Sequence, residues 1–169
     1  GDPSIKSIIV NPIRYNVGAY ETPHFEDINV NVNVSNYINV DELCFKFHIY
    51  LNDMYFNLTQ NQIEELFVDV TEYNSFECTG RLLDSSDGWE RFLLSFSTKS
   101  ISYNNSFILS LKTIESIFNK AIGDVFNKAL IKKIDISATA IFNSNNIESN
   151  IATVEFTRHE KKVDLQLLK

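Results

Sequence analysis

Between residues 28 and 34 the chain alternates strictly between branched aliphatic side chains and asparagines. Because successive side chains of a β-strand point to opposite faces, this period predicts a strand with one apolar face and one all-amide face. The apolar positions are Ile28, Val30, Val32 and Val34, and the amide positions are Asn29, Asn31 and Asn33. A strand covered on both faces of a parallel sheet would instead be apolar throughout. The segment therefore predicts an antiparallel sheet with one face on a core and the other in water.

The same period recurs over residues 43–51 and 134–142. Shorter apolar segments bounded by Asn and Asp turn residues predict further strands. These shorter strands are expected over residues 4–10, 54–58, 67–73, 76–82, 92–96, 101–103, 107–111 and 151–156. A mainly β chain with about nine or ten short strands indicates an antiparallel β-sandwich or a partly open barrel.

One segment has a helical period instead. Apolar residues recur at spacings of three and one from Ile114 to Leu130, the stripe of an amphipathic helix lying on a core. Lys128, Lys132 and Lys133 near its end would complement the helix dipole. We expect a single helix near residues 113–131.

Length and charge limit the class of protein. A chain of 169 residues fits a single domain, here residues 1–169. No apolar run approaches the ~18 residues of a membrane-spanning helix, so a soluble protein without membrane insertion is expected. The formal net charge is −7. Nucleic-acid binding needs a basic patch, so no nucleic-acid partner is expected. The sequence does not determine the cellular compartment, although an exported or surface-associated protein is preferred.

Cofactor signatures are missing from the sequence. The five glycines are too far apart for a phosphate-binding loop. Cys44 and His48 share a predicted strand face, but Lys46 lies between them, and zinc needs three or four ligands. No metal and no cofactor is therefore expected. Cys44 and Cys78 can form one bridge or remain two buried thiols, and the sequence does not choose between these states.

Ligand-binding candidates fall in two places. Asp84, Asp87 and Trp89 belong to a segment that reads as a plain turn or, less favourably, as a calcium loop. Trp89 is expected to close the core, with stacking on a sugar as its alternative. Tyr15, Tyr20 and Tyr37 lie in a stretch that resembles an aromatic recognition loop.

These patterns favour a non-catalytic protein-interaction or assembly module that binds a protein partner or itself through a sheet face, an edge or its C-terminal tail. Asn29, Asn31 and Asn33 are the interface candidates, since an uncharged strand face lacks the lysines that discourage strand pairing. A carbohydrate-binding β-sandwich domain is the alternative. A hydrolase with a dispersed site is the second alternative, because triads are recognised by geometry; no catalytic residue is assigned and an enzyme is disfavoured.

Overall fold

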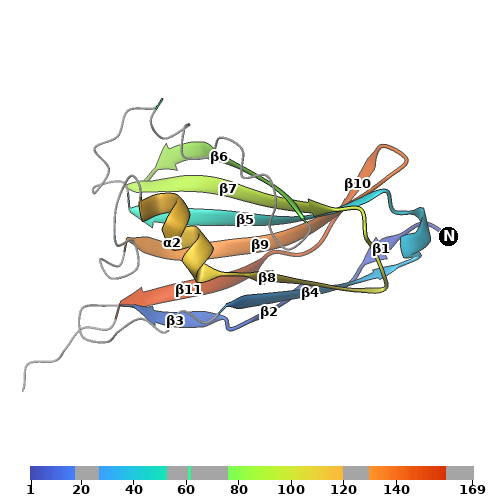
Figure 1. Ribbon diagram of the computed structural model, residues 1–169, viewed down its shortest axis with the longest axis horizontal. Helices are drawn as coiled ribbons and strands as arrows, with labels where there is room; N and C mark the ends of the chain where they lie inside the picture. The colour runs from blue at the N-terminus through green and yellow to red at the C-terminus, as the bar shows by residue number, and fades with distance from the viewer. Residues whose placement is uncertain (18–26, 53–60, 62–75, 120–129, 159–169) are drawn as a thin grey trace, which may run out of the picture.

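The computed structural model describes residues 1–17, 27–52, 61, 76–119 and 130–158. These residues form strands for the most part, arranged as two sheets packed face to face (Figure 1). The predicted β-sandwich is confirmed, and the described part of the chain contributes eleven strands to it.

The smaller sheet is built around β4 (Ile28–Ser35). On one side of β4 lie β1 (Ser4–Ile5) and β2 (Ile9–Asn11), end to end, and on the other side lies β8 (Asn104–Leu109). All three pairings are antiparallel. This sheet contains the alternating segment that constrained the fold most strongly in the sequence.

The larger sheet has the strand order β3-β11-β9-β5-β7-β6. Its strands are β3 (Arg14–Val17), β11 (Ala152–Arg158), β9 (Ile131–Phe142), β5 (Glu42–Asn52), β7 (Trp89–Thr98) and β6 (Glu77–Ser86). The short β10 (Asn145–Glu148) also pairs with β9. One pairing corrects the expectation of antiparallel sheets, since β3 runs parallel to β11. The N-terminal segment contributes β2 to the small sheet and, after residues 12 and 13, β3 to the large one.

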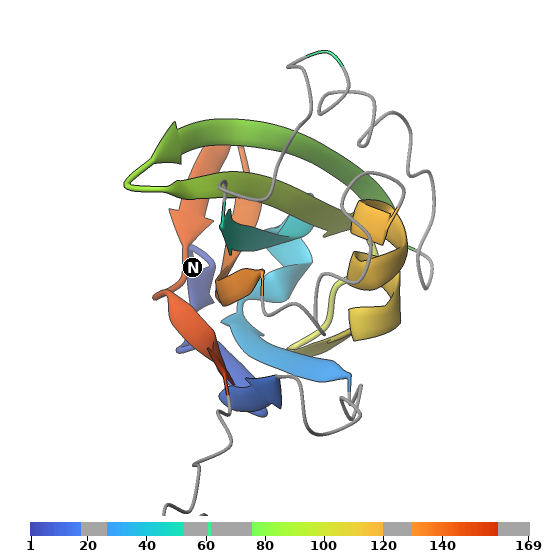
Figure 2. The ribbon, with the colours of Figure 1, turned by 90° about the vertical axis from the view of Figure 1, so that its left-hand side faces the viewer.

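The core lies between the sheets, where the inward faces of the alternating segments meet (Figure 2). Phe107 on β8 lies at its centre, with ring centroids 4.5 Å from Phe96, 4.8 Å from Phe76 and 5.6 Å from Phe47. Burying one such side chain contributes about 1.5–3 kcal/mol. The aromatic contacts therefore join β8 of the small sheet to the strands of the large one.

The helix is confirmed at its start and corrected at its end. α2 (Leu111–Asn119) buries Leu111, Ile114 and Phe118, and the Phe118 ring packs 5.1 Å from Phe92. The expected helix extended to residue 131, but Ile131 is the first residue of β9 and pairs with Leu51. Residues 120–129 lie outside the described part of the chain. β9 pairs with β5 as far as Leu51, so Ile131 belongs to the sheet and not to the helix.

Two predicted strands are also corrected. The expected strand over residues 4–10 is divided into β1 and β2. Residues 101–103 form no strand, because the Asn105 side chain bonds both backbone groups of Ser102, accepting at 3.0 Å and donating at 2.7 Å. The strands expected over residues 54–58 and 67–73 lie outside the described residues. Within the described segments, no helix is long and apolar enough to cross a membrane.

Candidate functional site

The outer face of the small sheet presents side chains in rungs that cross three strands. One rung contains Ile9, Asn31 and Ser106, and the next contains Asn11, Asn29 and Ile108. Period two places these residues on one face, while their neighbours along each strand point into the sandwich. The asparagine face predicted from the sequence is therefore the central part of a wider surface, which also includes side chains of β2 and β8.

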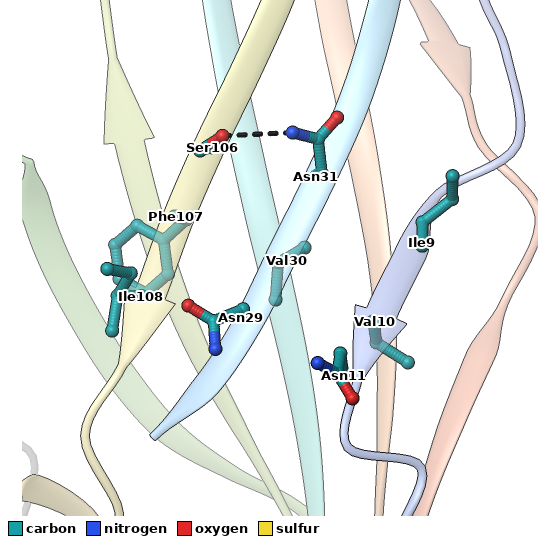
Figure 3. Close-up of a pocket in the computed structure, with 9 residues that line it drawn as sticks. All are labelled: Ile9, Val10, Asn11, Asn29, Val30, Asn31, Ser106, Phe107 and Ile108. Atoms are coloured by element: carbon teal, nitrogen blue, oxygen red, sulfur yellow. Dashed lines mark hydrogen bonds between the residues drawn. The ribbon is translucent and has the colours of Figure 1, made fainter. Parts of the chain in front are cut away.

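This surface is shallow and partly preorganised. Asn31 donates a hydrogen bond from Nδ2 to Oγ of Ser106 at 2.9 Å, which links β4 to β8 across the face (Figure 3). A hollow of about 300 Å³ lies over the same strands, and the residues of both rungs line it. Ile9 and Ile108 remain 66% and 45% exposed, so the amides are flanked by apolar side chains in contact with water.

The outward residues of β1, β2, β4 and β8 carry no charge. They are Ser4, Ile9, Asn11, Asn29, Asn31, Asn33, Ser35, Asn104, Ser106 and Ile108. One cation lies within this surface, because Lys6, between β1 and β2, donates its backbone N–H to the Asn33 carbonyl at 3.0 Å and its ammonium to the Tyr103 hydroxyl at 3.2 Å. We call these ten uncharged residues the amide face.

The outer face of the large sheet is different in character, because it is rich in ionic side chains. His48, Tyr50, Arg91 and Asp135 line a hollow of about 110 Å³ there. Arg91 pairs with Asp84 at 2.7 Å, and Lys133 pairs with Asp135 at 3.3 Å. This hollow is the second candidate site.

The charges of this second site restrict its chemistry. Burial lowers the pKa of His48 below 6.5, and the nearby Arg91 cation lowers it further, so the imidazole is neutral at neutral pH. A neutral imidazole has one basic nitrogen, as a general base requires. However, the two carboxylate oxygens of Asp135 are engaged by the Thr153 hydroxyl at 2.7 Å and by Lys133. The carboxylate is therefore held by these two groups, and the geometry favours a cross-strand ion-pair network over a catalytic pair.

The structure separates the predicted ligand residues of the 84–89 segment. Asp87 and Gly88 form the turn between β6 and β7, with φ of 51° and 76°. Asp84 lies on β6 and is paired with Arg91. Trp89 is half-buried, and the Lys132 ammonium lies 4.9 Å from the centre of its ring. The segment forms a hairpin turn, and the Lys132 ammonium already lies over one face of the indole.

The predicted tyrosine cluster is also divided. Tyr15 is buried on β3 and stacks on Phe156 at 5.4 Å, so its ring belongs to the core. Tyr37 lies in the 3-10 helix η1 (Tyr37–Asn39) and packs half-buried against the core. Tyr20 lies outside the described residues.

Cys44 and Cys78 are both free and buried. The Cys44 thiol lies 2.8 Å from the Ser95 hydroxyl, within hydrogen-bond distance. Burial raises the pKa of Cys78 to about 12. Of the two states left open by the sequence, the structure has the buried thiols. No group of three or more potential metal ligands occurs among the described residues.

Sequence reasoning did not identify the flanks of the amide face. Ile9 was placed within one continuous strand, Asn104 and Asn105 were interpreted as turn residues, and the strand was expected to begin only at Phe107. The available signal was a weak alternation over residues 104–109, where Asn105, Phe107 and Leu109 are buried and their neighbours are exposed. Asn105 weakened this signal, because a buried asparagine interrupts the pattern of apolar residues.

No family model and no curated protein matches the chain. Among solved structures, the chain is similar to AggA, the major subunit of aggregative adherence fimbriae type I from Escherichia coli. The match has 13% sequence identity and a TM-score of 0.35, and it covers 94% of this chain and 97% of that chain. The likeness is weak, and the function proposed below rests on the chain's own residues.

Proposed function

We propose that this chain is a non-catalytic interaction module that self-associates through its small sheet. The observation that carries the proposal is the absence of charge from the outward residues of β1, β2, β4 and β8, on a chain whose net charge is −7. Exposed apolar side chains at both flanks of this surface add area that would gain from burial.

Charge favours the small sheet as the contact surface. Two copies of an acidic chain repel each other, and like charges brought together in an interface cost several kcal/mol. Contact through the amide face avoids this cost. The outer face of the large sheet carries Lys46, Arg91 and Lys133 together with Asp84 and Asp135, which would all lose water in a contact.

The chemistry of the amide face suits a second copy of the same chain. Each asparagine side chain both donates and accepts hydrogen bonds, so a surface of amides and hydroxyls can complement itself. Most soluble oligomers are homo-oligomers with twofold symmetry, in which the same patch meets its own copy. A self-complementary patch satisfies that requirement without a second protein.

The two other functions receive less support from the described geometry. Sugar stacking on Trp89 would have to displace or share the ring with Lys132. Hydrolysis through His48 would need a partner other than the Asp135 oxygens already held by Thr153 and Lys133. Within the described segments, neither alternative is supported by a specific arrangement of side chains.

A pair of lysine substitutions tests the proposal. Ser106→Lys places a cation on β8 of the small sheet, and Ser97→Lys places the same cation on β7, on the outer face of the large sheet. Size-exclusion chromatography with light scattering should find wild type and Ser97→Lys associated, and Ser106→Lys monomeric. Equal masses for the two variants, or a wild type that is monomeric at every concentration, would contradict the proposal. Thermal melting checks that both variants are folded.

A further inference from the structure

We propose that the outer edge of β8 pairs antiparallel with β8 of a second copy, so that two small sheets become one continuous sheet. This inference rests on the proposed self-association of the small sheet, and it places the contact at the edge of that sheet and not across the amide face. In this arrangement the two copies contact each other through backbone hydrogen bonds, and their amide faces lie side by side.

The register of the small sheet shows which backbone groups face outward. The Val34 amide donates to the Tyr103 carbonyl at 2.8 Å, and the Lys6 amide donates to the Asn33 carbonyl at 3.0 Å. In an antiparallel pair the hydrogen-bonded residues alternate with non-hydrogen-bonded ones. The even residues of β4 therefore bond the odd residues of β8. The backbone N–H and C=O groups of Asn104, Ser106 and Ile108 consequently point away from β4.

No described strand takes up these outward groups, since β8 pairs with β4 alone among the residues the structure describes. The Ser102 hydroxyl donates to the Asn104 carbonyl at 2.7 Å, and that oxygen retains a second lone pair. α2 begins beyond the end of β8 and runs toward β7, so it does not follow the edge (Figure 1). An edge of this kind is a template for another strand.

Four other strand edges bound the described sheets, and each carries a feature that discourages pairing. β10 contains four residues and ends with the charged Glu148. β1 and β2 contain two and three residues and are interrupted around Lys6. β3 contains four residues and begins with the charged Arg14. Short strands and edge charges are the usual ways in which sheet edges are protected.

The edge strand β6 is long but also protected. It contains ten residues, among them Glu77, Arg81 and Asp84, and its register with β7 shifts between Leu82 and Asp84. In contrast, β8 has six residues with no charge, proline or glycine, and its register with β4 is continuous. Of the described edges, β8 is the one without such protection.

The pairing has a definite register if the axis is twofold. The outward groups are centred on Ser106, so Ser106 lies opposite Ser106 of the partner subunit. Asn104 then lies opposite Ile108 of the partner subunit, and the three outward residues all form hydrogen-bonded pairs. Opposed residues in such pairs have Cα atoms about 5.5 Å apart, within the range that a disulfide bridges.

Cysteine cross-linking in the full chain tests this register. Ser106→Cys should form a disulfide-linked dimer on mild oxidation. Asn104→Cys and Ile108→Cys should cross-link when the two variants are mixed, and neither should cross-link alone, because each is about 14 Å along the strand from its own copy. Wild type is the matched control, since its two thiols are buried and should give no dimer.

A backbone substitution provides an independent test. Both Ser106→Pro and Ser106→Ala lose the side-chain bond from Asn31 and keep the backbone bonds to β4. Only the proline variant also loses the outward N–H. The alanine variant should associate as wild type does, and the proline variant should be monomeric and folded by circular dichroism. If Ser106→Pro does not fold, the cysteine pattern alone decides.

The failure of this inference can be distinguished from that of the proposed function. If association is abolished by Ser106→Lys but the cysteine pattern is absent, the edge pairing is wrong and the self-association stands. In that case Asn31→Lys, which alters the face and leaves the β8 edge intact, should abolish association. If the wild type does not associate, both proposals fail.

Discussion

At the scale of single residues, neighbours on β8 have opposite roles. Phe107 is buried among the aromatic rings of the core, and the next residue, Ile108, is 45% exposed on the amide face. Both side chains are large and apolar, so only their positions in the alternation of β8 distinguish the buried one from the exposed one. A pair of truncations can therefore measure the difference between a core position and a surface position within one strand.

Phe107→Ala should lower the free energy of unfolding by about 3–5 kcal/mol, because it leaves a cavity among four rings. Ile108→Ala in the monomer should change it by less than about 0.5 kcal/mol. Urea denaturation at low protein concentration measures both. Similar losses for the two variants would show that the two faces of β8 are assigned incorrectly.

The two thiols are expected to be unreactive in the folded protein. Burial raises the pKa of Cys78 to about 12, and the thiolate is the reactive form. Ellman's reagent at pH 8 should detect no rapidly reacting thiol in the native protein and two after denaturation. Fewer than two thiols in denaturant would indicate a bridge that the structure excludes.

His48 should make stability depend on pH below the ordinary pKa of an imidazole. Because burial and Arg91 lower its pKa below 6.5, the unfolded chain binds a proton at a higher pH than the folded chain does. Stability should therefore be unaffected by this group above pH 6.5 and should decline as the pH falls through the lowered value. Melting curves of wild type and His48→Gln check this. The variant should lose less stability on acidification, and identical slopes would show that His48 does not contribute.

At the scale of elements, the β6–β7 hairpin depends on its turn. Positive φ at both Asp87 and Gly88 is typical of the turn that matches the twist of two antiparallel strands. Gly88→Ala places a Cβ in the left-handed region and should cost about 1–2 kcal/mol. Denaturant unfolding measures the cost, and Gly80→Ala within β6 serves as a comparison. An unchanged stability for Gly88→Ala would contradict the turn assignment.

The sequence predicted the elements whose period is strong. β4, β5 and β9 follow from alternation of apolar and polar side chains, β7 follows from a shorter apolar segment, and the start of α2 follows from its helical stripe. The sequence did not predict the short elements and strand ends that depend on tertiary contacts. β3 exists because it pairs with β11, and Ile131 joins β9 because β5 extends to meet it. Neither contact leaves a local signal in the chain.

The candidate site was predicted in part. Asn29, Asn31 and Asn33 were identified from their period, and their neighbours on β2 and β8 emerged only when the sheet brought three strands together. The ligand candidates Tyr15 and Trp89 were selected by residue type. Residue type does not determine burial, and the structure places Tyr15 in the core and Trp89 half-buried beside Lys132.

At the scale of the whole molecule, the two outer faces of the sandwich differ in charge. The large sheet presents a network of ion pairs, and the small sheet presents the amide face and the edge of β8, which has no second partner strand among the described residues. An acidic chain with one side that carries no carboxylate on its strands, and whose cation there is Lys6, has a preferred direction of approach for its own copy. We therefore predict a symmetric dimer, which leaves the charged faces in water.

Sedimentation equilibrium of the wild-type protein tests this claim most directly. Over increasing protein concentration, the mass should rise from the 19.4 kDa of one chain toward twice that value and then stop, because twofold pairing of β8 closes on itself. A mass that stays at one chain throughout would contradict self-association. A mass that continues to rise beyond two chains would contradict a closed twofold contact.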